Sequence, residues 1–425
     1  MTDSTGAPAP RMRRQLPVWK DVAPLLRRRI REKDRVRRRV SRAHSLADLA
    51  RIARRRTPRS VFEYVSGGAD QERSLRRARA SFASVEFHPR VLRDVSAADP
   101  AATVLGRPSA MPLVLAPTGF TRMMHHEGEI AVARAAERAA VPYCLSSMST
   151  TSLEDLAAAV PGGRRWFQLY MWNDRAGVRE LVARAAGTGF EALILTVDTP
   201  VSGNRLRDRR NGLSIPPALT ARTLVDMGRH PSWWFNLLTT APLGFATLAP
   251  SGGVDDELID KLFNPALSIE DLRWLRQQWS GKLLVKGIQT VDDARLAADA
   301  GADAVVLSNH GGRQLDRSPS PLELLPSVVE AVGSHAEIYL DTGITSGADV
   351  VAAVGLGARA CLIGRAYLYG LMAGGETGVD RVLELFREDM LRTLQLTGAV
   401  SLDDVKGKVS LPPTRHRADP GHRTA

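Results

Sequence analysis

The sequence predicts an α/β protein built on a closed parallel barrel of eight strand–helix units, a TIM (β/α)8 barrel. Short β-branched apolar runs recur from residue 111 onward, and a polar turn and a stretch of helical periodicity follow them. Eight successive units are the number that closes such a barrel. The runs predicted as strands are residues 111–117, 141–146, 164–171, 191–198, 282–287, 303–310, 337–343 and 358–365.

Helical periodicity predicts helices between these strands, at residues 127–140, 175–186, 269–279, 291–300 and 348–354. The competing architecture is a doubly wound open sheet, which carries Gly-x-Gly-x-x-Gly after its first strand. No such motif follows the first predicted strand, and eight units succeed one another. The barrel is therefore favoured.

We expect the barrel domain to span residues 45–398. It begins with an N-terminal helical extension, because residues 45–56 and 57–64 have the pattern of two amphipathic helices. The segment from there to about residue 100 suggests a lid or packing layer. Residues 1–44 are predicted to form a basic, partly disordered arm, and residues 399–425 a C-terminal tail.

A long insert is predicted after the fourth strand. About eighty residues separate this strand from the fifth, where one unit needs roughly thirty. Residues 206–264 are therefore expected to hang over the active-site mouth. Prolines interrupt their uncharged stretch at 231–254, which would make a poor membrane-spanning helix. Its Trp233-Trp234-Phe235 could still enter a bilayer interface.

The positive charge of the chain is concentrated near its N-terminus. Residues 1–60 contain 19 Lys and Arg against 5 Asp and Glu, a net charge of +14, whereas the whole chain carries +12. The blocks Arg27-Arg28-Arg29 and Arg37-Arg38-Arg39 would attract polyanions. A solvated tail and an anionic membrane surface are equally favoured. Nucleic acid is not predicted as a partner, because no recognisable nucleic-acid-binding module accompanies the charge.

The two cysteines indicate a reducing compartment. Cys144 and Cys361 lie in apolar strand-like runs and read as small core residues rather than a disulfide. No secretory signal is apparent, because the arginines at 11–14 are not followed by an apolar core of sufficient length. The expected location is cytoplasmic, at the inner face of the cell membrane.

The polar run after the sixth predicted strand, Ser308 to Asp316, is the strongest functional signal. Within it, His310 can accept a proton near neutral pH, and Arg313 can bind a carboxylate through two hydrogen bonds. Gly311 and Gly312 allow close approach of the backbone to a ligand. The strand therefore delivers a base and a carboxylate-binding group to one loop.

Other polar residues also fall at the ends of predicted strands, where barrel enzymes place their chemistry. Glycine-bearing loops after strands seven and eight match a phosphate-binding site, with Arg365 as a candidate partner, so a phosphorylated cofactor is expected. No cluster with metal-ligand spacing and no Ser-His-acid signature accompanies them, so no metal is predicted. One histidine, two arginines, two tyrosines and a lysine suit proton abstraction from a carboxylate-bearing substrate, with electrons passing to a redox cofactor.

These residues resemble the FMN-dependent 2-hydroxy-acid dehydrogenase and oxidase family. The likeness covers about residues 46–398, and Ser-Asn-His-Gly-Gly-Arg-Gln is its most specific motif. The Trp-containing insert is most similar to the bacterial quinone-linked L-lactate dehydrogenase branch. The motifs that carry the resemblance are Ser308 to Asp316, Ala116-Pro117-Thr118, Gln168-Leu169-Tyr170, Thr196-Val197-Asp198-Thr199-Pro200 and Lys286-Gly287.

The resemblance implies a role for each matching position. His310 would be the base, and Asp198 would stabilise its imidazolium. The implied catalytic residues are His310, Asp198, Tyr170 and Arg313, and the implied substrate-binding residues are Tyr64, Tyr170, Arg205 and Arg313. The implied FMN contacts are Pro117, Thr118, Gly119, Ser146, Gln168, Thr196, Lys286, Ser308, Asp341, Gly343, Gly364 and Arg365.

Three positions depart from the family pattern. Thr345 stands where many members have a second phosphate-binding arginine. Met148 replaces an aromatic residue of short-chain oxidases. Gly119 replaces alanine and is expected to leave more room near the flavin.

The first functional hypothesis is FMN-dependent oxidation of an L-2-hydroxy acid, with L-lactate to pyruvate as the first candidate and membrane quinone as electron acceptor. The alternatives are an (S)-2-hydroxy-acid oxidase that reduces O2 to H2O2, and a relative that acts on a bulkier 2-hydroxy acid. An FMN barrel isomerase is disfavoured, because two carboxylate-binding arginines do not suit a diphosphate substrate. A non-enzymatic barrel tethered by the arm is the remaining hypothesis. The resemblance also implies a homo-oligomer, commonly a tetramer.

Overall fold

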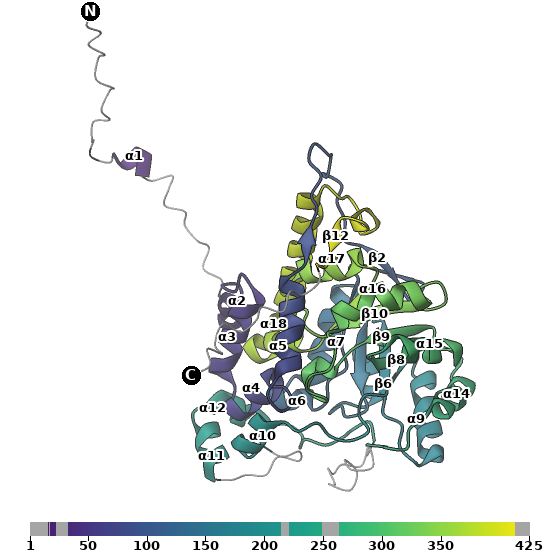
Figure 1. The fold of residues 1–425 in the computed structure, drawn as a ribbon. Helices are drawn as coiled ribbons and strands as arrows, with labels where there is room; N and C mark the ends of the chain where they lie inside the picture. The colour runs from purple at the N-terminus through teal and green to yellow at the C-terminus, as the bar shows by residue number, and fades with distance from the viewer. Residues whose placement is uncertain (1–15, 17, 23–32, 214–220, 249–262, 413–425) are drawn as a thin grey trace, which may run out of the picture.

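A computed structural model describes residues 16, 18–22, 33–213, 221–248 and 263–412, and its centre is a closed barrel of eight parallel strands (Figure 1). The strand order around the barrel is β10-β11-β4-β5-β6-β7-β8-β9. Each predicted run coincides with one strand to within a few residues, which confirms the TIM barrel. The strands are β4 (Leu113–Leu115), β5 (Tyr143–Ser146), β6 (Arg165–Leu169), β7 (Ala192–Thr196), β8 (Lys282–Ile288), β9 (Ala304–Leu307), β10 (Glu337–Asp341) and β11 (Ala360–Ile363).

The five predicted helices between the strands are present as α7 (Gly128–Arg138), α9 (Arg175–Gly187), α14 (Ile269–Gln278), α15 (Val291–Asp299) and α17 (Gly347–Gly355). Three further helices complete the outer ring, α8 (Leu153–Ala159), α16 (Pro321–Val332) and α18 (Arg365–Thr397). Proline and glycine conceal two of them from the sequence pattern. Pro326 lies inside α16, and α18 bends where Gly374 and Gly375 leave the helical conformation.

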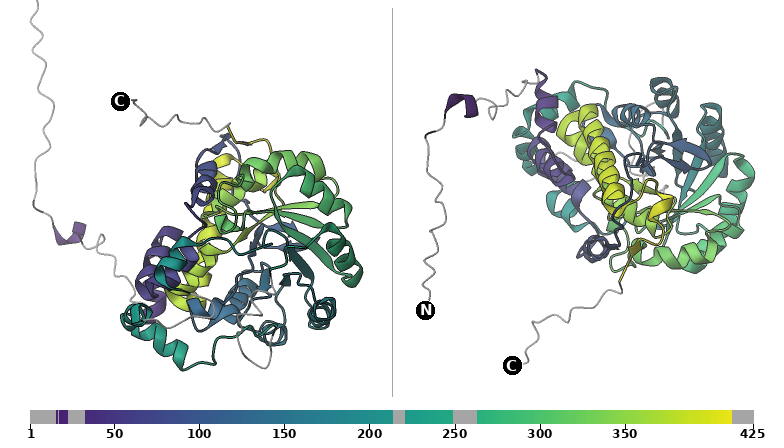
Figure 2. Two further views of the ribbon diagram at one scale, coloured as in Figure 1. Left: turned by 60° about the horizontal axis from the view of Figure 1, so that its bottom comes forward. Right: turned by 90° about the horizontal axis from the view of Figure 1, so that it is seen from above.

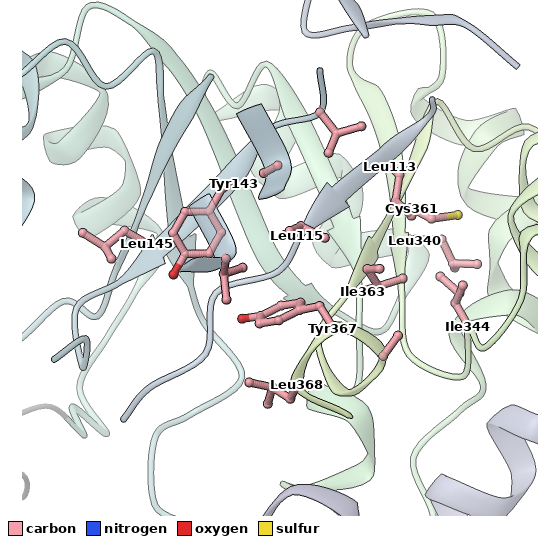
Figure 3. Close-up of a cluster of buried hydrophobic side chains, with 14 of the residues drawn as sticks. Leu113, Leu115, Tyr143, Leu145, Leu340, Ile344, Cys361, Ile363, Tyr367 and Leu368 are labelled. Carbon is pink, nitrogen blue, oxygen red and sulfur yellow. The ribbon is translucent and has the colours of Figure 1, made fainter. Parts of the chain in front are cut away.

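The apolar core has two layers separated by the barrel wall. Inside the barrel, the rings of Trp166 and Tyr339 pack edge to face, with centroids 6.1 Å apart. Outside it, the strands pack against the helices, and Figure 3 shows part of this layer around Tyr367 of α18. Cys144 lies in the inner layer and Cys361 in the outer one, both buried and unpaired, as predicted.

A short hairpin closes the end of the barrel opposite the active-site mouth. It consists of β2 (Ala102–Val104) and β3 (Arg107–Ser109), and the backbone N–H of Leu105 donates to the hydroxyl of Tyr339 at 3.1 Å. Nearby, β1 (Glu86–Phe87) pairs with β12 (Val409–Ser410), preceded by the 3-10 turn η3 (Asp403–Val405). The beginning of the predicted C-terminal tail is therefore folded against the N-terminal extension.

The N-terminal extension is helical, as predicted. Its helices are α3 (Leu46–Arg56), α4 (Arg59–Ser66) and α5 (Arg73–Ala83), whereas α1 (Trp19–Val22) and α2 (Arg35–Val40) lie in the segment predicted as the basic arm. Helix α3 runs beside α18 (Figure 2), and Arg39 of α2 donates from Nε to the carbonyl of Ala373 at 3.0 Å. Much of the predicted arm, including Arg27-Arg28-Arg29 and the arginines at 11–14, lies outside the described residues.

Helices α10 (Leu206–Asn211), α11 (Ala221–Gly228) and α12 (Pro231–Leu238) lie between β7 and β8, in the segment predicted as an insert. They rest on α4 and on the short helix α6 (Thr121–Met124). Asp226 accepts a hydrogen bond from the N–H of Ser60 at 3.2 Å, and Trp233 Nε1 donates to the carbonyl of Met123 at 3.0 Å. Residues 214–220 and 249–262 of the predicted insert lie outside the described residues. Among the described helices, none has the length and apolarity required to cross a membrane.

Candidate active site

A cavity of about 1160 Å³ opens at the C-terminal ends of the barrel strands, and residues of α4, α6 and α10 line it. These three helices lie at the bottom of Figure 1. Four predicted site residues are buried directly behind its wall: Gln168, Thr196, Asp198 and Ser308. The others line the cavity: Tyr64, Pro117, Thr118, Gly119, Ser146, Tyr170, Arg205, Lys286, His310, Arg313, Asp341, Gly343, Gly364 and Arg365.

His310 and Asp198 form a pair at this wall. His310 begins the 3-10 turn η2 (His310–Gly312) after β9, and its Nδ1 lies 3.0 Å from Oδ1 of Asp198, which follows β7. Burial alone would raise the pKa of Asp198, but the charges of His310 and Lys286 outweigh burial and lower this pKa. An ionised Asp198 accepts the Nδ1–H of His310. The tautomer favoured by this pair leaves Nε2 of His310 as the proton acceptor.

Two glycines allow the loops to meet at this pair. At Gly287 the β8–β9 register shifts and φ is +111°, and a Cβ there would lie 2.7 Å from Cβ of Asp198. At Gly311 φ is +66°, and a Cβ would lie 2.6 Å from Nη1 of Arg365. Residues with side chains rarely adopt these conformations and would collide here, so the motif requires glycine at both positions.

Five arginines line the cavity, and three of them, Arg205, Arg313 and Arg365, lie close to one another. The Cζ atoms of Arg313 and Arg205 lie 4.7 and 5.4 Å from the centre of the Tyr64 ring. Burial, with the nearby charges of Arg205 and Arg365, lowers the pKa of Arg313 to about 10. Among the described residues, the carboxylate that pairs with Arg205 is that of Asp208, at 3.7 Å. An anionic ligand would relieve this crowding of positive charge.

Two of these arginines, Arg313 and Arg365, also contact the C-terminus of α4. Arg313 Nη1 donates to the carbonyl of Tyr64, and Arg365 donates to the carbonyls of Val65 and Gly67 at 2.9 and 2.8 Å. Cations are favourable at a helix C-terminus, where carbonyl groups lack partners within the helix. These contacts hold Tyr64 at the cavity, a role for the arginines that the sequence does not predict.

A buried lysine lies deeper in the cavity. Lys286 Nζ is 3.2 Å from Oδ2 of Asp341 and donates to Oγ of Ser308 at 3.1 Å. Burial lowers its pKa, but the carboxylates of Asp341 and Asp198 act more strongly in the opposite direction, so its pKa is raised overall. Lys286 is therefore held as a cation at neutral pH.

A buried hydrogen-bond donor without a partner tests whether the residues of the site fit FMN. Ser146 Oγ donates to Oε1 of Gln168 at 2.9 Å, whereas the buried Nε2 of Gln168 has no partner within the described part of the chain. Such a donor is costly unless a ligand accepts its hydrogen bond. Together with the cation of Lys286 and the glycine loops beside Arg365, it fits a planar cofactor with acceptor atoms and a phosphate.

One residue that the sequence does not single out contacts the loop after β10. Arg79 of α5 lines the cavity, pairs with Asp349 at 2.9 Å and donates to the carbonyl of Gly343. Asp349 also accepts the N–H of Thr345 at 2.7 Å. A cation from the N-terminal extension therefore stands near Thr345, where the family pattern often has arginine. No local signal in α5 could have placed it there.

Two buried groups support the loops after β4 and β5. The hydroxyl of Tyr367 lies 2.5 Å from Oγ1 of Thr118 and donates to the carbonyl of Ala116 at 2.9 Å. The carboxylate of Glu129 accepts hydrogen bonds from the N–H and hydroxyl of Thr150 at 2.8 and 2.6 Å. Both groups come from helices outside the predicted motifs, so strand-end reasoning misses them.

The expectation of extra space at Gly119 is wrong. A Cβ at this position would lie 2.9 Å from Cβ of Met148, because the Met148 side chain already occupies the space that a methyl group would take. The two departures from the family pattern are therefore coupled through direct contact.

One group of potential metal ligands lies apart from the residues discussed above. Ligand atoms of the consecutive residues His125, His126 and Glu127 lie within 4.8 Å of one another. Glu127 already accepts the N–H of Glu376 at 2.8 Å, and the charges of Arg56 and Arg39 reach His125. This positive environment disfavours a cation.

The His310–Asp198 pair, the cluster of arginines and the unsatisfied Nε2 of Gln168 place this barrel among flavin-dependent oxidoreductases that act on 2-hydroxy acids. The chain belongs to the FMN-dependent dehydrogenase family, whose sequence profile matches residues 53–411. It is thus an FMN-dependent oxidoreductase of 2-hydroxy acids.

Several relatives cover nearly the whole chain. A protein from Mycobacterium tuberculosis is 55% identical over 392 residues, covering 92% of this chain and 95% of its own. An L-lactate dehydrogenase from Caulobacter vibrioides is 43% identical, covering 83% and 94%. Among solved structures, the monotopic membrane protein (S)-mandelate dehydrogenase is 38% identical with a TM-score of 0.83, and covers 87% of this chain and 99% of its own. A mandelate oxidase is also 38% identical, with a TM-score of 0.75 and the same coverage.

Proposed function

We propose that the protein oxidises L-lactate to pyruvate and passes the electrons to a membrane quinone. The observation that carries the chemistry is the pairing of His310 with the buried carboxylate of Asp198, 3.0 Å apart, beside the guanidinium groups of Arg205, Arg313 and Arg365. The named L-lactate dehydrogenases among the relatives support the choice of substrate. Bound FMN would supply the two-electron acceptor, held by the residues around Lys286 and Gln168.

In the proposed reaction, Arg313 and Arg205 bind the substrate carboxylate and fix the hydroxyl carbon in the cavity. Nε2 of His310 removes the proton from the substrate hydroxyl. The second hydrogen leaves the α-carbon together with two electrons, which bound FMN would accept. Asp198 stabilises the imidazolium that results. The two arginines supply orientation, and the pair supplies the proton acceptor.

Tyr170 and Tyr64 are proposed hydrogen-bond partners of the substrate. Burial, together with the negative charge of Asp198, raises the pKa of Tyr170. Its hydroxyl therefore remains protonated and can donate to a substrate oxygen at neutral pH.

We also propose that the protein is peripheral at the inner face of the cell membrane. Helices α11 and α12 expose Val225, Phe235 and Leu238, whose relative accessibilities are 62%, 57% and 73%. The basic end of α3 lies beside them, because Arg56 Nη2 donates to Oγ of Ser232 at 3.3 Å. Exposed apolar side chains next to arginines suit an anionic bilayer surface.

Acceptor and substrate are tested with the purified holoenzyme. L-Lactate should reduce the flavin anaerobically faster than D-lactate or (S)-mandelate, and a ubiquinone analogue should reoxidise it faster than air does. Rapid reoxidation in air with release of H2O2 would establish the oxidase alternative. Preference for (S)-mandelate, the substrate named for the solved relatives, would establish the bulkier-substrate alternative.

Membrane binding is tested by sedimentation with anionic vesicles. Phe235→Asp should weaken binding, whereas Leu296→Asp, at an exposed site on α15, should leave it unchanged. Removal of residues 1–32 should reduce retention but spare activity. This truncation stops before α2, because Val40 is buried against the barrel domain. Equal binding by wild type and Phe235→Asp would refute the assignment to α12.

The predicted tetramer is checked by light scattering.

A further inference from the structure

The proposed active site is divided between two loops that must keep a fixed spacing. The loop after β7 carries Asp198 and Arg205, whereas the loop after β9 carries His310 and Arg313. Each loop thus supplies one half of the base pair and one half of the carboxylate-binding pair. A small shift between the loops would disturb both functions.

Gln314 connects these loops through all three polar positions of its amide. Nε2 donates to the carbonyl of Asp198 at 3.0 Å and to the carbonyl of Val201 at 2.9 Å. Oε1 accepts the N–H of Gly203 at 2.9 Å. These three partners fix the orientation of the amide. If it were flipped, Oε1 would face two carbonyl oxygens and Nε2 would face an N–H group. Although Gln314 lines the cavity edge, its amide is committed to the backbone.

The two loops are also in backbone contact at Gly203. A Cβ there would lie 2.1 Å from the carbonyl oxygen of Arg313 and 2.9 Å from Cα of Gln314. Within the described part of the chain, residues 199–203 have no hydrogen bond to the β9 loop other than those of Gln314. Residues 200–202 are exposed, Val201 to 63%, so packing holds this part of the segment weakly, although Thr199 is buried. The glutamine is its main attachment.

We infer that Gln314 is a positioning residue that fixes the Asp198–Arg205 loop against the His310–Arg313 loop. The inference rests on the proposed function, because it assigns the base to one loop and its carboxylate partner to the other. Gln314 acts through the backbone of Asp198 and not on the substrate. Its loss should therefore weaken the proton acceptor and the carboxylate grip together.

The test compares Gln314→Met with Asn204→Ala in the FMN-loaded enzyme. Methionine is similar in length but cannot make the three hydrogen bonds. Asn204 lies in the same loop, and its Nδ2 ties the loop outward to Asp70 at 2.7 Å. We expect Gln314→Met to retain FMN and to lose about 10- to 100-fold in kcat/KM for L-lactate, the scale of a small misplacement. Asn204→Ala should lose less than about threefold.

Two readouts separate positioning from general stability. The loss in kcat/KM should combine a lower kcat with a higher KM in Gln314→Met, because Asp198 and Arg205 lie on the same displaced loop. Amide hydrogen exchange across residues 198–205 should accelerate in Gln314→Met.

The possible outcomes are distinct. A Gln314→Met enzyme with wild-type kcat/KM, or with a loss confined to kcat or to KM alone, would overturn the positioning role. If this variant does not fold, Gln314→Glu replaces it. Glutamate has the same length and keeps the acceptor for the N–H of Gly203, but its second oxygen faces the carbonyls of Asp198 and Val201 and cannot donate to them. If wild-type enzyme oxidises no 2-hydroxy acid, the proposed function fails, and hydrogen exchange still reports whether Gln314 holds the loop.

Discussion

Replacing Asp198 with asparagine tests the charge at the centre of the proposed site. Asparagine has the same shape and can still accept a hydrogen bond from Nδ1 of His310, but it carries no negative charge. The pair is 3.0 Å apart and the carboxylate is buried, with 2% of its side chain exposed. The substitution therefore removes mainly the attraction between this charge and the imidazolium formed during catalysis.

The size of the effect follows from the spacing. Two unit charges about 4 Å apart attract by roughly 4 kcal/mol at an effective dielectric constant near 20. The hydrogen bond retained by asparagine returns about 1 kcal/mol of this. A net loss of about 3 kcal/mol corresponds to a roughly hundredfold slower proton transfer. The KM for L-lactate should change little, because Asp198 lies behind the cavity wall.

The assay is anaerobic stopped-flow reduction of the flavin by L-lactate. Asp316→Asn is the matched control, because Asp316 lies in the loop after β9 but accepts the N–H groups of Ser74 and Gln71, at 2.8 and 3.1 Å. It should alter stability and leave the reduction rate near that of wild type. Reduction of FMN-loaded Asp198→Asn at the wild-type rate would refute the electrostatic role.

Three further predictions concern binding, pH and packing. Arg313→Lys should raise the KM for L-lactate about 10- to 100-fold in steady-state assays, because an ammonium cannot form the bidentate contact; an unchanged KM would contradict the carboxylate role. Burial, together with the charges of His126, Arg56 and Arg39, lowers the pKa of His125 to about 3. Between pH 6.5 and about 3, the imidazole of His125 binds a proton in the unfolded chain but not in the folded chain. The free energy of unfolding should therefore fall by up to about 1.4 kcal/mol for each pH unit that the pH is lowered within this range. Urea unfolding at several pH values should show a smaller loss in His125→Gln, and identical slopes would refute the assignment. Gly378→Ala should destabilise by about 1–3 kcal/mol in thermal unfolding, since its Cβ would lie 1.9 Å from the carbonyl oxygen of Gly370. Gly187→Ala, with open space around it, should not destabilise.

The strands are predictable because their signal is local. Each buried parallel strand is a short apolar run, and the barrel topology then brings strand ends together without further information. For this reason His310, Lys286 and Asp341 meet around one cavity although they are far apart in sequence. Helices α16 and α18 escape prediction because proline and glycine inside them read as breaks, whereas packing against the barrel overrides that local preference.

Contacts between distant segments could not be predicted from the strand ends. Arg313 and Arg365 cap α4, and Arg79 reaches from α5 to the loop after β10. These positions depend on how the N-terminal extension docks on the barrel. The contact between Gly119 and Met148 is likewise a matter of packing, so the small residue alone suggested space that is in fact filled.

The most direct test of the central claim is to mix L-lactate anaerobically with the FMN-loaded enzyme and with its His310→Gln variant. The visible flavin absorbance of the wild type should bleach, whereas the variant should retain FMN and bleach at least about a hundredfold more slowly. Equal bleaching by the two proteins, or a wild-type flavin that every 2-hydroxy acid leaves oxidised, would contradict the assignment of His310 as the base.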